Sequence, residues 1–127
     1  MSETVATMVQ EAKAGIQNLT PSEVSAEAEA GALLIDVREE DERRNNGVIP
    51  GSVPAPRGML EFYADPASPY YRPEFRTDRR IVLVCASGGR SALATATLHR
   101  MGYHDVAHLD GGIRAWVEAG YAVDETQ

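Results

Sequence analysis

The sequence predicts an α/β domain whose sheet is mainly parallel and is covered by helices on both faces. Two runs, at residues 32–37 and 80–85, are apolar at successive positions, which is typical of strands buried on both sides. Strand and helix patterns alternate after the first run, and helical crossovers of this kind connect parallel strands. The 127 residues suffice for one such domain with its own core.

The first part of the chain is predicted to be a helical leader. Apolar side chains recur at helical spacing through residues 4–17, so we expect an amphipathic helix that packs by one face. A second helix is expected over residues 21–30, because its start carries a capping residue, a proline and a capping-box glutamate, namely Thr20, Pro21 and Glu23. We expect the leader, residues 1–30, to pack on a domain formed by residues 31–127.

The remaining elements follow in order along the chain. After the first apolar run, residues 38–46 predict a loop with a helical turn, and residues 47–53 predict a turn that leads into a short strand. Residues 57–64 are expected to form one or two helical turns before an irregular, proline-rich surface segment. The second apolar run predicts another strand. The last three elements are a helix, a strand and a helix, over residues 91–101, 106–109 and 113–119.

The charge balance disfavours two classes of partner. Twelve basic and 19 acidic residues give a formal net charge of −7, and such a surface repels nucleic-acid phosphates and anionic lipids. The apolar stretches are far shorter than the ~20 residues of a membrane-spanning helix. The N-terminus also lacks the basic and apolar regions of a signal peptide. We therefore expect a cytoplasmic protein that binds neither nucleic acid nor a membrane.

The single cysteine, Cys85, lies between a buried strand and the start of a helix, where ligands gather in parallel α/β domains. One cysteine excludes an internal disulfide, a CxxC redox pair and a cysteine-rich zinc site. Gly88 and Gly89 let successive backbone N–H groups point inward, and Arg90 adds a permanent positive charge. Such surroundings favour the thiolate, so a reactive cysteine is favoured over one that merely fills space.

Four blocks of the sequence resemble, in order, the signature blocks of single-domain rhodaneses. They read LIDVRE at residues 34–39, GVIPGS at 47–52, CASGGRS at 85–91 and LDGGIRAW at 109–116. The resemblance covers about residues 33–123. It implies a rhodanese-like fold with a five-stranded, mainly parallel sheet and helices on both faces. It also implies sulfur transfer through a cysteine persulfide.

The resemblance assigns a role to each matching residue. Cys85 matches the family's nucleophile. The residues after it match an anion-cradling loop and the start of the helix behind that loop: Ala86, Ser87, Gly88, Gly89, Arg90 and Ser91. Asp36 matches the acidic residue that ends the first core strand and is expected to hold neighbouring loops in place. Arg38 is expected to form a structural ion pair. Arg90 has two alternative tasks: to bind an anionic donor, or to brace the loop through an ion pair with a residue such as Asp36 or Glu39.

Three other features of the sequence bear on the site. Arg57 follows a short strand and is a candidate second cation for an anionic substrate, with a solvated arginine as the alternative. The family's turn often reads Gly-His-Ile-Pro-Gly after an aromatic residue, whereas this chain has Val48 for the histidine and two arginines before the turn, Arg43 and Arg44. His104 and His108 would share a strand face with Asp110 nearby, and three ligands crowded on one strand and turn make a poor tetrahedral cage. A structural role is therefore favoured over a metal site for His99, His104 and His108.

Three functions from different classes remain open. In a sulfurtransferase, the Cys85 thiolate would take the outer sulfur of a donor such as thiosulfate and pass it to cyanide or to a thiol on a small molecule or a protein. No metal or cofactor is expected in this reaction. Cysteine phosphatases also use an anion loop, but theirs resembles Cys-x5-Arg, and here four residues separate Cys85 from Arg90. A non-catalytic binding or sensor module is the third alternative. The sequence leaves the donor, the acceptor and the oligomeric state open.

Overall fold

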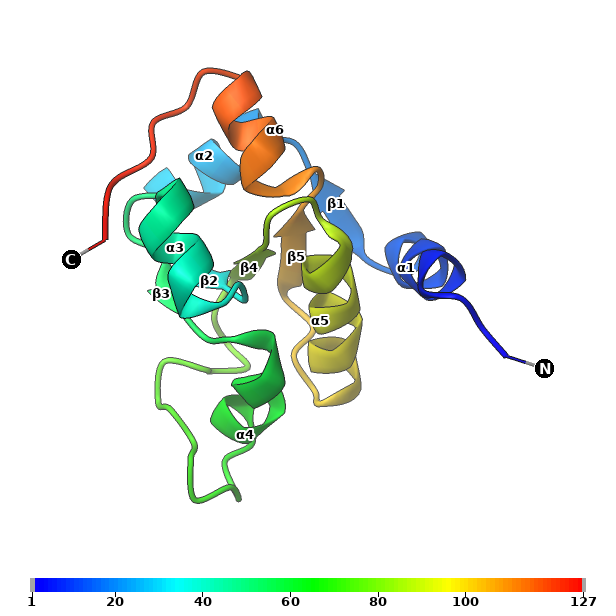
Figure 1. Ribbon diagram of the computed structural model, residues 1–127. Helices are drawn as coiled ribbons and strands as arrows, with labels where there is room; N and C mark the ends of the chain where they lie inside the picture. Colours follow the sequence, from blue (N-terminus) through cyan, green and yellow to red (C-terminus); the bar gives the residue numbers. More distant parts are fainter. Residues whose placement is uncertain (1, 127) are drawn as a thin grey trace.

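The computed structural model describes residues 2–126 as an α/β fold built on one five-stranded sheet (Figure 1). The strands lie in the order β1-β5-β4-β2-β3, and each neighbouring pair is parallel. Their bounds are Gln17–Leu19 (β1), Leu33–Asp36 (β2), Val53–Pro54 (β3), Ile81–Val84 (β4) and Val106–Leu109 (β5). The predicted fold class is therefore confirmed, together with the strand number that the resemblance implied.

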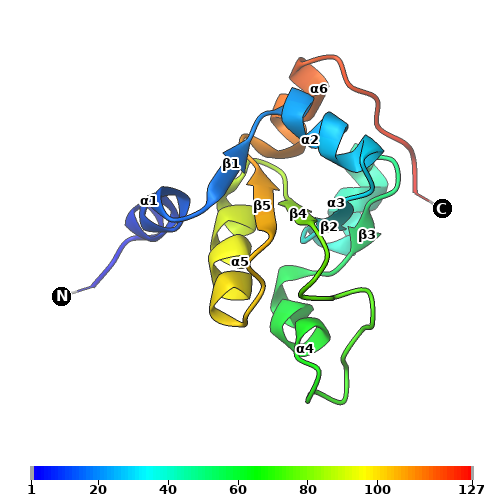
Figure 2. The same ribbon diagram turned by 180° about the vertical axis from the view of Figure 1, so that it is seen from behind.

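Helices cover both faces of the sheet (Figures 1 and 2). The helices are α1 Val5–Ala14, α2 Pro21–Glu29, α3 Glu40–Asn46, α4 Leu60–Ala64, α5 Gly89–Arg100 and α6 Gly112–Glu118, with a 3-10 turn η1 at Arg57–Met59. Ile81 and Leu83 pack under α4 and α5, whereas Val82 and Val84 pack under α2 and α6. Successive residues of β4 thus enter two different cores, which explains its unbroken apolar run.

The first helix is shorter than the sequence predicts. Helix α1 ends at Ala14, and Gln17 begins β1, the edge strand that pairs with β5. The prediction of a helix through residue 17 is wrong because Gly15 ends the helix and the edge of β5 offers these residues a ladder of hydrogen bonds. Helix α1 lies beside α5 in both views, but Val5 and Met8 are exposed, so it buries less of its apolar face than expected.

The other predicted elements are present with small shifts at their ends. Thr20 Oγ1 accepts a hydrogen bond from Glu23 N at 3.2 Å, and Glu23 Oε1 accepts one from Thr20 N at 2.9 Å, so the predicted capping box begins α2. The charged segment predicted as a loop with a turn forms α3, with acidic residues in its first turn and basic residues in its last. None of the helices in residues 2–126 is long and apolar enough to cross a membrane.

The N-terminal segment contributes to the sheet and to the core. Strand β1 extends the sheet beyond β5, and Val24 of α2 is fully buried. The boundary drawn between residues 30 and 31 stays a prediction.

Candidate active site

Cys85 lies at the carboxyl end of β4, directly before the loop that leads into α5. Its side chain is buried, with the residue 1% exposed. Two backbone N–H groups point at the sulfur: Gly88 N lies 3.1 Å and Ser91 N lies 3.3 Å from Sγ. Gly88 adopts φ +101°, a left-handed conformation that turns the chain into the helix. Gly88 belongs to the loop predicted to cradle an anion, whereas Ser91 was predicted as the start of the helix behind that loop.

The rest of the loop is held against the start of α6. Ile113 N donates to Cys85 O at 2.9 Å, and Arg114 N donates to Ala86 O at 3.1 Å. Gly112 has φ +65°, and a Cβ at this position would collide with the carbonyl group of Ala86. The second glycine of the LDGGIRAW block is therefore required for the close approach of these two segments.

Asp36 is the centre of a buried ionic cluster at the end of β2. Its carboxylate accepts from Arg38 N at 3.0 Å and pairs with the guanidinium groups of Arg38 and Arg43, each at 2.8 Å. Arg38 also donates to Gly47 O at 2.8 Å, so the cluster ties β2 to the end of α3. The sequence placed Asp36 and Arg38 here but not Arg43, which reaches Asp36 only because α3 packs over the strand end.

Arg90 forms a two-pronged ion pair with Glu42 of α3. The nitrogen–oxygen distances are 2.7 and 2.8 Å, and the hydrogen bonds from Arg90 lower the pKa of Glu42 to about 2. An ion pair of Arg90 with a residue such as Asp36 or Glu39 was predicted, and these two partners are wrong. Glu42 faces Arg90 because it lies at the third position of α3, where it also accepts from Glu39 N at 3.0 Å.

Arg57 does not join the cysteine loop. Its guanidinium pairs with Glu61 at 2.9 Å and donates to Thr97 at 3.3 Å. Thr97 lies on α5 eight residues after Gly89, which is ~12 Å along a helix. Arg57 lines a separate cavity between α1 and α5.

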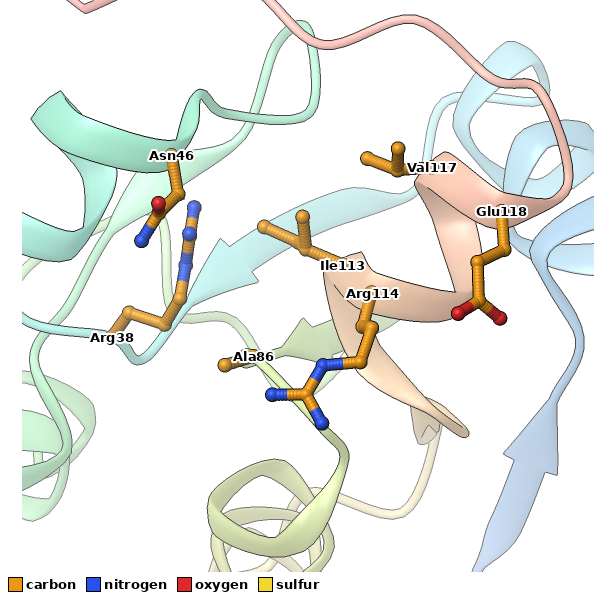
Figure 3. Close-up of a pocket in the computed structure, with 7 residues that line it drawn as sticks. All are labelled: Arg38, Asn46, Ala86, Ile113, Arg114, Val117 and Glu118. Atoms are coloured by element: carbon orange, nitrogen blue, oxygen red, sulfur yellow. The ribbon is translucent and has the colours of Figure 1, made fainter.

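A cavity of about 370 Å³ opens beside the cysteine loop (Figure 3). Its walls are Arg38, Asn46, Ala86, Ile113, Arg114, Val117 and Glu118. In the close-up the Arg114 side chain points from α6 towards Ala86, whereas the guanidinium of Arg38 donates to Asp36 and to Gly47 O. Arg114 is exposed, and no ion pair of its side chain is found within residues 2–126. Arg114 was not among the predicted site residues, although it lies in the LDGGIRAW block that the sequence shows.

His108, for which a structural role is predicted, lies behind the cysteine loop and is fully buried. Its Nδ1 lies 2.8 Å from Ser91 Oγ, and its Nε2 lies 2.7 Å from Asn18 Oδ1. Burial lowers the pKa of His108 to about 4, so the ring is neutral near pH 7. Residues 2–126 contain no group of three His, Cys, Asp or Glu side chains placed to hold a metal ion.

Comparison with known proteins gives a consistent family match. Residues 20–119 match the family model of the rhodanese-like domain. A sulfurtransferase of Allochromatium vinosum is 35% identical over 91 residues, which is 72% of this chain and 77% of that protein. The thiosulfate sulfurtransferase GlpE of Pseudomonas savastanoi pv. phaseolicola is 31% identical over 100 residues, covering 79% of this chain and 86% of that protein.

Solved structures show the same fold. A protein of unknown function from Rhodopseudomonas palustris, described as a possible tyrosine phosphatase, is 40% identical, with a TM-score of 0.92 and coverage of 98% of this chain and 96% of that chain. A rhodanese-related protein from Thermoplasma volcanium is 27% identical, with a TM-score of 0.70 and coverage of 84% and 96%. The family model begins after β1, whereas the Rhodopseudomonas structure covers nearly the whole chain.

Proposed function

This chain belongs to the rhodanese-like domain family, and we propose that it is a sulfurtransferase that carries sulfur on Cys85. One observation carries the proposal: the sulfur of the chain's single cysteine faces two backbone N–H donors at the start of a helix. Such donors stabilise a negative sulfur without a metal ion or a cofactor. The sulfurtransferase relatives support the general activity.

The reaction we propose has two balanced steps. First, the Cys85 thiolate attacks the outer sulfur of an anionic donor such as thiosulfate, and sulfite leaves with the electrons of the broken sulfur–sulfur bond. Cys85 then holds a persulfide anion that can accept from the N–H groups of Gly88 and Ser91. In the second step cyanide or a thiolate, on a small molecule or a protein, attacks the terminal sulfur and restores the Cys85 thiolate.

The surroundings of the loop suit an anionic donor. The protein carries a net charge of −7, so positive potential must be supplied locally. The start of α5 provides part of it through its N–H groups. Arg114 lines the cavity beside Ala86 and forms no ion pair within residues 2–126, so it provides a full charge there, while Glu118 lines the same cavity. Arg90, predicted in the loop before the helix, lies in the first turn of α5 instead, and its charge is balanced by Glu42. We therefore assign donor attraction to Arg114 and loop bracing to Arg90.

The intact mass of the protein after incubation with thiosulfate tests this function. We expect a gain of one sulfur atom that a reductant removes, and no gain in Cys85→Ser. The same mass gain in Cys85→Ser, or no gain in the wild-type protein, would contradict the proposal. Transfer to cyanide, followed as thiocyanate, tests the second step.

A cysteine phosphatase is the second candidate, because the Rhodopseudomonas relative is described as a possible tyrosine phosphatase. Two features of this loop argue against it. Four residues separate Cys85 from Arg90, one fewer than in the phosphatase pattern, and both terminal nitrogens of the Arg90 guanidinium donate to Glu42. We expect sulfur transfer to cyanide to exceed hydrolysis of an aryl phosphate on the same preparation. Efficient hydrolysis without sulfur transfer would reverse this order, and absence of both activities would favour a binding module.

A further inference from the structure

A series of hydrogen bonds links Cys85 to His108, a buried histidine that has no role in the proposed sulfur transfer. Cys85 Sγ lies 3.5 Å from Ser91 Oγ, and Ser91 Oγ lies 2.8 Å from His108 Nδ1. On the far side of the ring, His108 Nε2 lies 2.7 Å from Asn18 Oδ1. These hydrogen bonds therefore run from the end of β4 through α5 and β5 to β1, and Cys85, Ser91 and His108 are buried.

Asn18, at the far end of this hydrogen-bond series, fixes the direction of every hydrogen bond in the series. Asn18 Nδ2 lies 3.0 Å from Lys13 O and 3.2 Å from Ile16 O, and because carbonyl groups only accept, the amide nitrogen must face them. Asn18 therefore offers its oxygen to His108, so Nε2 of the neutral ring carries the proton and Nδ1 accepts. The hydroxyl of Ser91 then donates to Nδ1 and leaves its oxygen free to accept from the Cys85 thiol.

We propose that His108 is the proton acceptor for Cys85 and that Ser91 carries the proton between them. In this step the S–H bond of Cys85 breaks as Ser91 Oγ takes the proton, and the original hydroxyl proton of Ser91 passes to His108 Nδ1. The products are a thiolate and an imidazolium, with no oxidation or reduction. The inference rests on the proposed role of Cys85 as the nucleophile.

Every group keeps a partner after the transfer. The thiolate would accept from Gly88 N, Ser91 N and the reversed hydroxyl of Ser91. The imidazolium would donate through Nδ1 to Ser91 Oγ and through Nε2 to Asn18 Oδ1. Because no hydrogen bond of the series is lost, the same side chains serve both protonation states without rearrangement.

Charged side chains lie near both ends of the hydrogen-bond series, at His108 and at Cys85. At the histidine end, Asp110 raises the pKa of His108 and Lys13 lowers it, and these two residues form an ion pair at 2.9 Å. At the sulfur end lies Arg90, paired with Glu42. Burial keeps the ring neutral while Cys85 is a thiol, so Nδ1 is open to accept. A thiolate two hydrogen bonds away then offsets part of the penalty for charging the ring.

Alkylation of Cys85 by iodoacetamide as a function of pH tests the inference, because it measures the thiolate and needs no sulfur donor. In His108→Asn, the side-chain oxygen can still accept from Ser91 but cannot take its proton. We expect the alkylation midpoint of this variant to rise by about one pH unit, with about tenfold slower alkylation near pH 7. Ser91→Ala should give the same direction of change, and the exposed His104→Asn should match the wild-type protein.

Two results would overturn the inference. The first is an unchanged or lowered midpoint in folded His108→Asn, which is expected if the histidine only orients the hydroxyl. The second comes from the ring ¹⁵N shifts of His108 in the wild-type protein, which must show the Nε2–H form. An Nδ1–H ring contradicts the proposal even if the variants do not fold. Failure of thiosulfate loading alone would instead reject the sulfurtransferase assignment.

Discussion

At the scale of single residues, the site depends on charges that are buried and balanced by specific partners. Asp36 is fully buried, and the two guanidinium groups against it are 1% and 8% exposed. Removal of one member of such a cluster lowers the free energy of unfolding by more than the intact cluster contributes, because it leaves a buried charge without a counter-ion. Asp36 therefore supports the site by holding β2 and α3 together.

We predict that Asp36→Ala lowers the free energy of unfolding by about 3–5 kcal/mol, because Arg38 and Arg43 lose their common acceptor. Denaturant unfolding measures this loss. Asp78→Ala is the matched control, because Asp78 pairs with Arg76 at the surface and its removal should leave the unfolding midpoint unchanged. Unchanged stability of Asp36→Ala with loss of sulfur loading would show instead that Asp36 takes part in the chemistry.

The Arg90–Glu42 pair gives a second prediction at this scale. The pKa of Glu42 is about 2 in the folded protein and 4.5 for an ordinary glutamate, so the pair stabilises the fold fully above about pH 4.5 and loses this contribution as pH falls towards 2. We expect Glu42→Gln to be less stable than the wild-type protein at pH 6 and the difference to shrink below pH 4. Denaturant melts across this range provide the measurement, and a difference that does not vary with pH would contradict the ion pair.

At the scale of elements, the sequence predicts those whose signal is local. The apolar run of β4 and the capping box of α2 are such signals, and both elements lie where predicted. Strand β1 carries no such signal, because it is short and partly exposed and exists through its pairing with β5. The partner of Arg90 was equally hidden, because Glu42 and Arg90 are 48 residues apart and meet only when α3 and α5 are placed by the sheet.

The packing of α6 against the cysteine loop gives a prediction about an element junction. A Cβ at Gly112 would collide with the Ala86 carbonyl, whereas Gly102, with φ +97°, has no atom within 4 Å of the equivalent position. Both substitutions by alanine strain the backbone, at ~1 kcal/mol, but only Gly112→Ala must also displace the loop. We expect Gly112→Ala to slow sulfur loading by thiosulfate at least ~tenfold and Gly102→Ala to leave it unchanged. Equal rates in both variants would mean that α6 does not hold the loop in its reactive form.

At the scale of the whole molecule, a net negative charge repels anions, whereas the proposed site carries a positive charge that attracts them. The net charge of −7 opposes the approach of any anion, while the cavity beside Ala86 holds the guanidinium of Arg114. The block that contains Arg114 was recognisable in the sequence, but its place beside the cysteine loop was not, because it depends on how α6 crosses the end of β4. The first nineteen residues show the same limit, since Lys13 reaches Asp110 and Asn18 reaches His108 only in the folded chain.

This contrast of charges leads to a prediction about the donor. Loss of a unit charge near a dianion at a solvated surface is worth about 1 kcal/mol, so we expect Arg114→Ala to raise the KM for thiosulfate about fivefold at low salt. Arg100→Ala, which removes the same charge from the exposed far end of α5, is the matched control and should change KM much less. Because salt screens such interactions, the difference between the two variants should shrink as ionic strength rises. Steady-state kinetics at two salt concentrations measure this, with unfolding midpoints to show that both variants are folded. If Arg114→Ala and Arg100→Ala raised KM equally, the net charge of the surface rather than the cavity beside Ala86 would govern the approach of the donor.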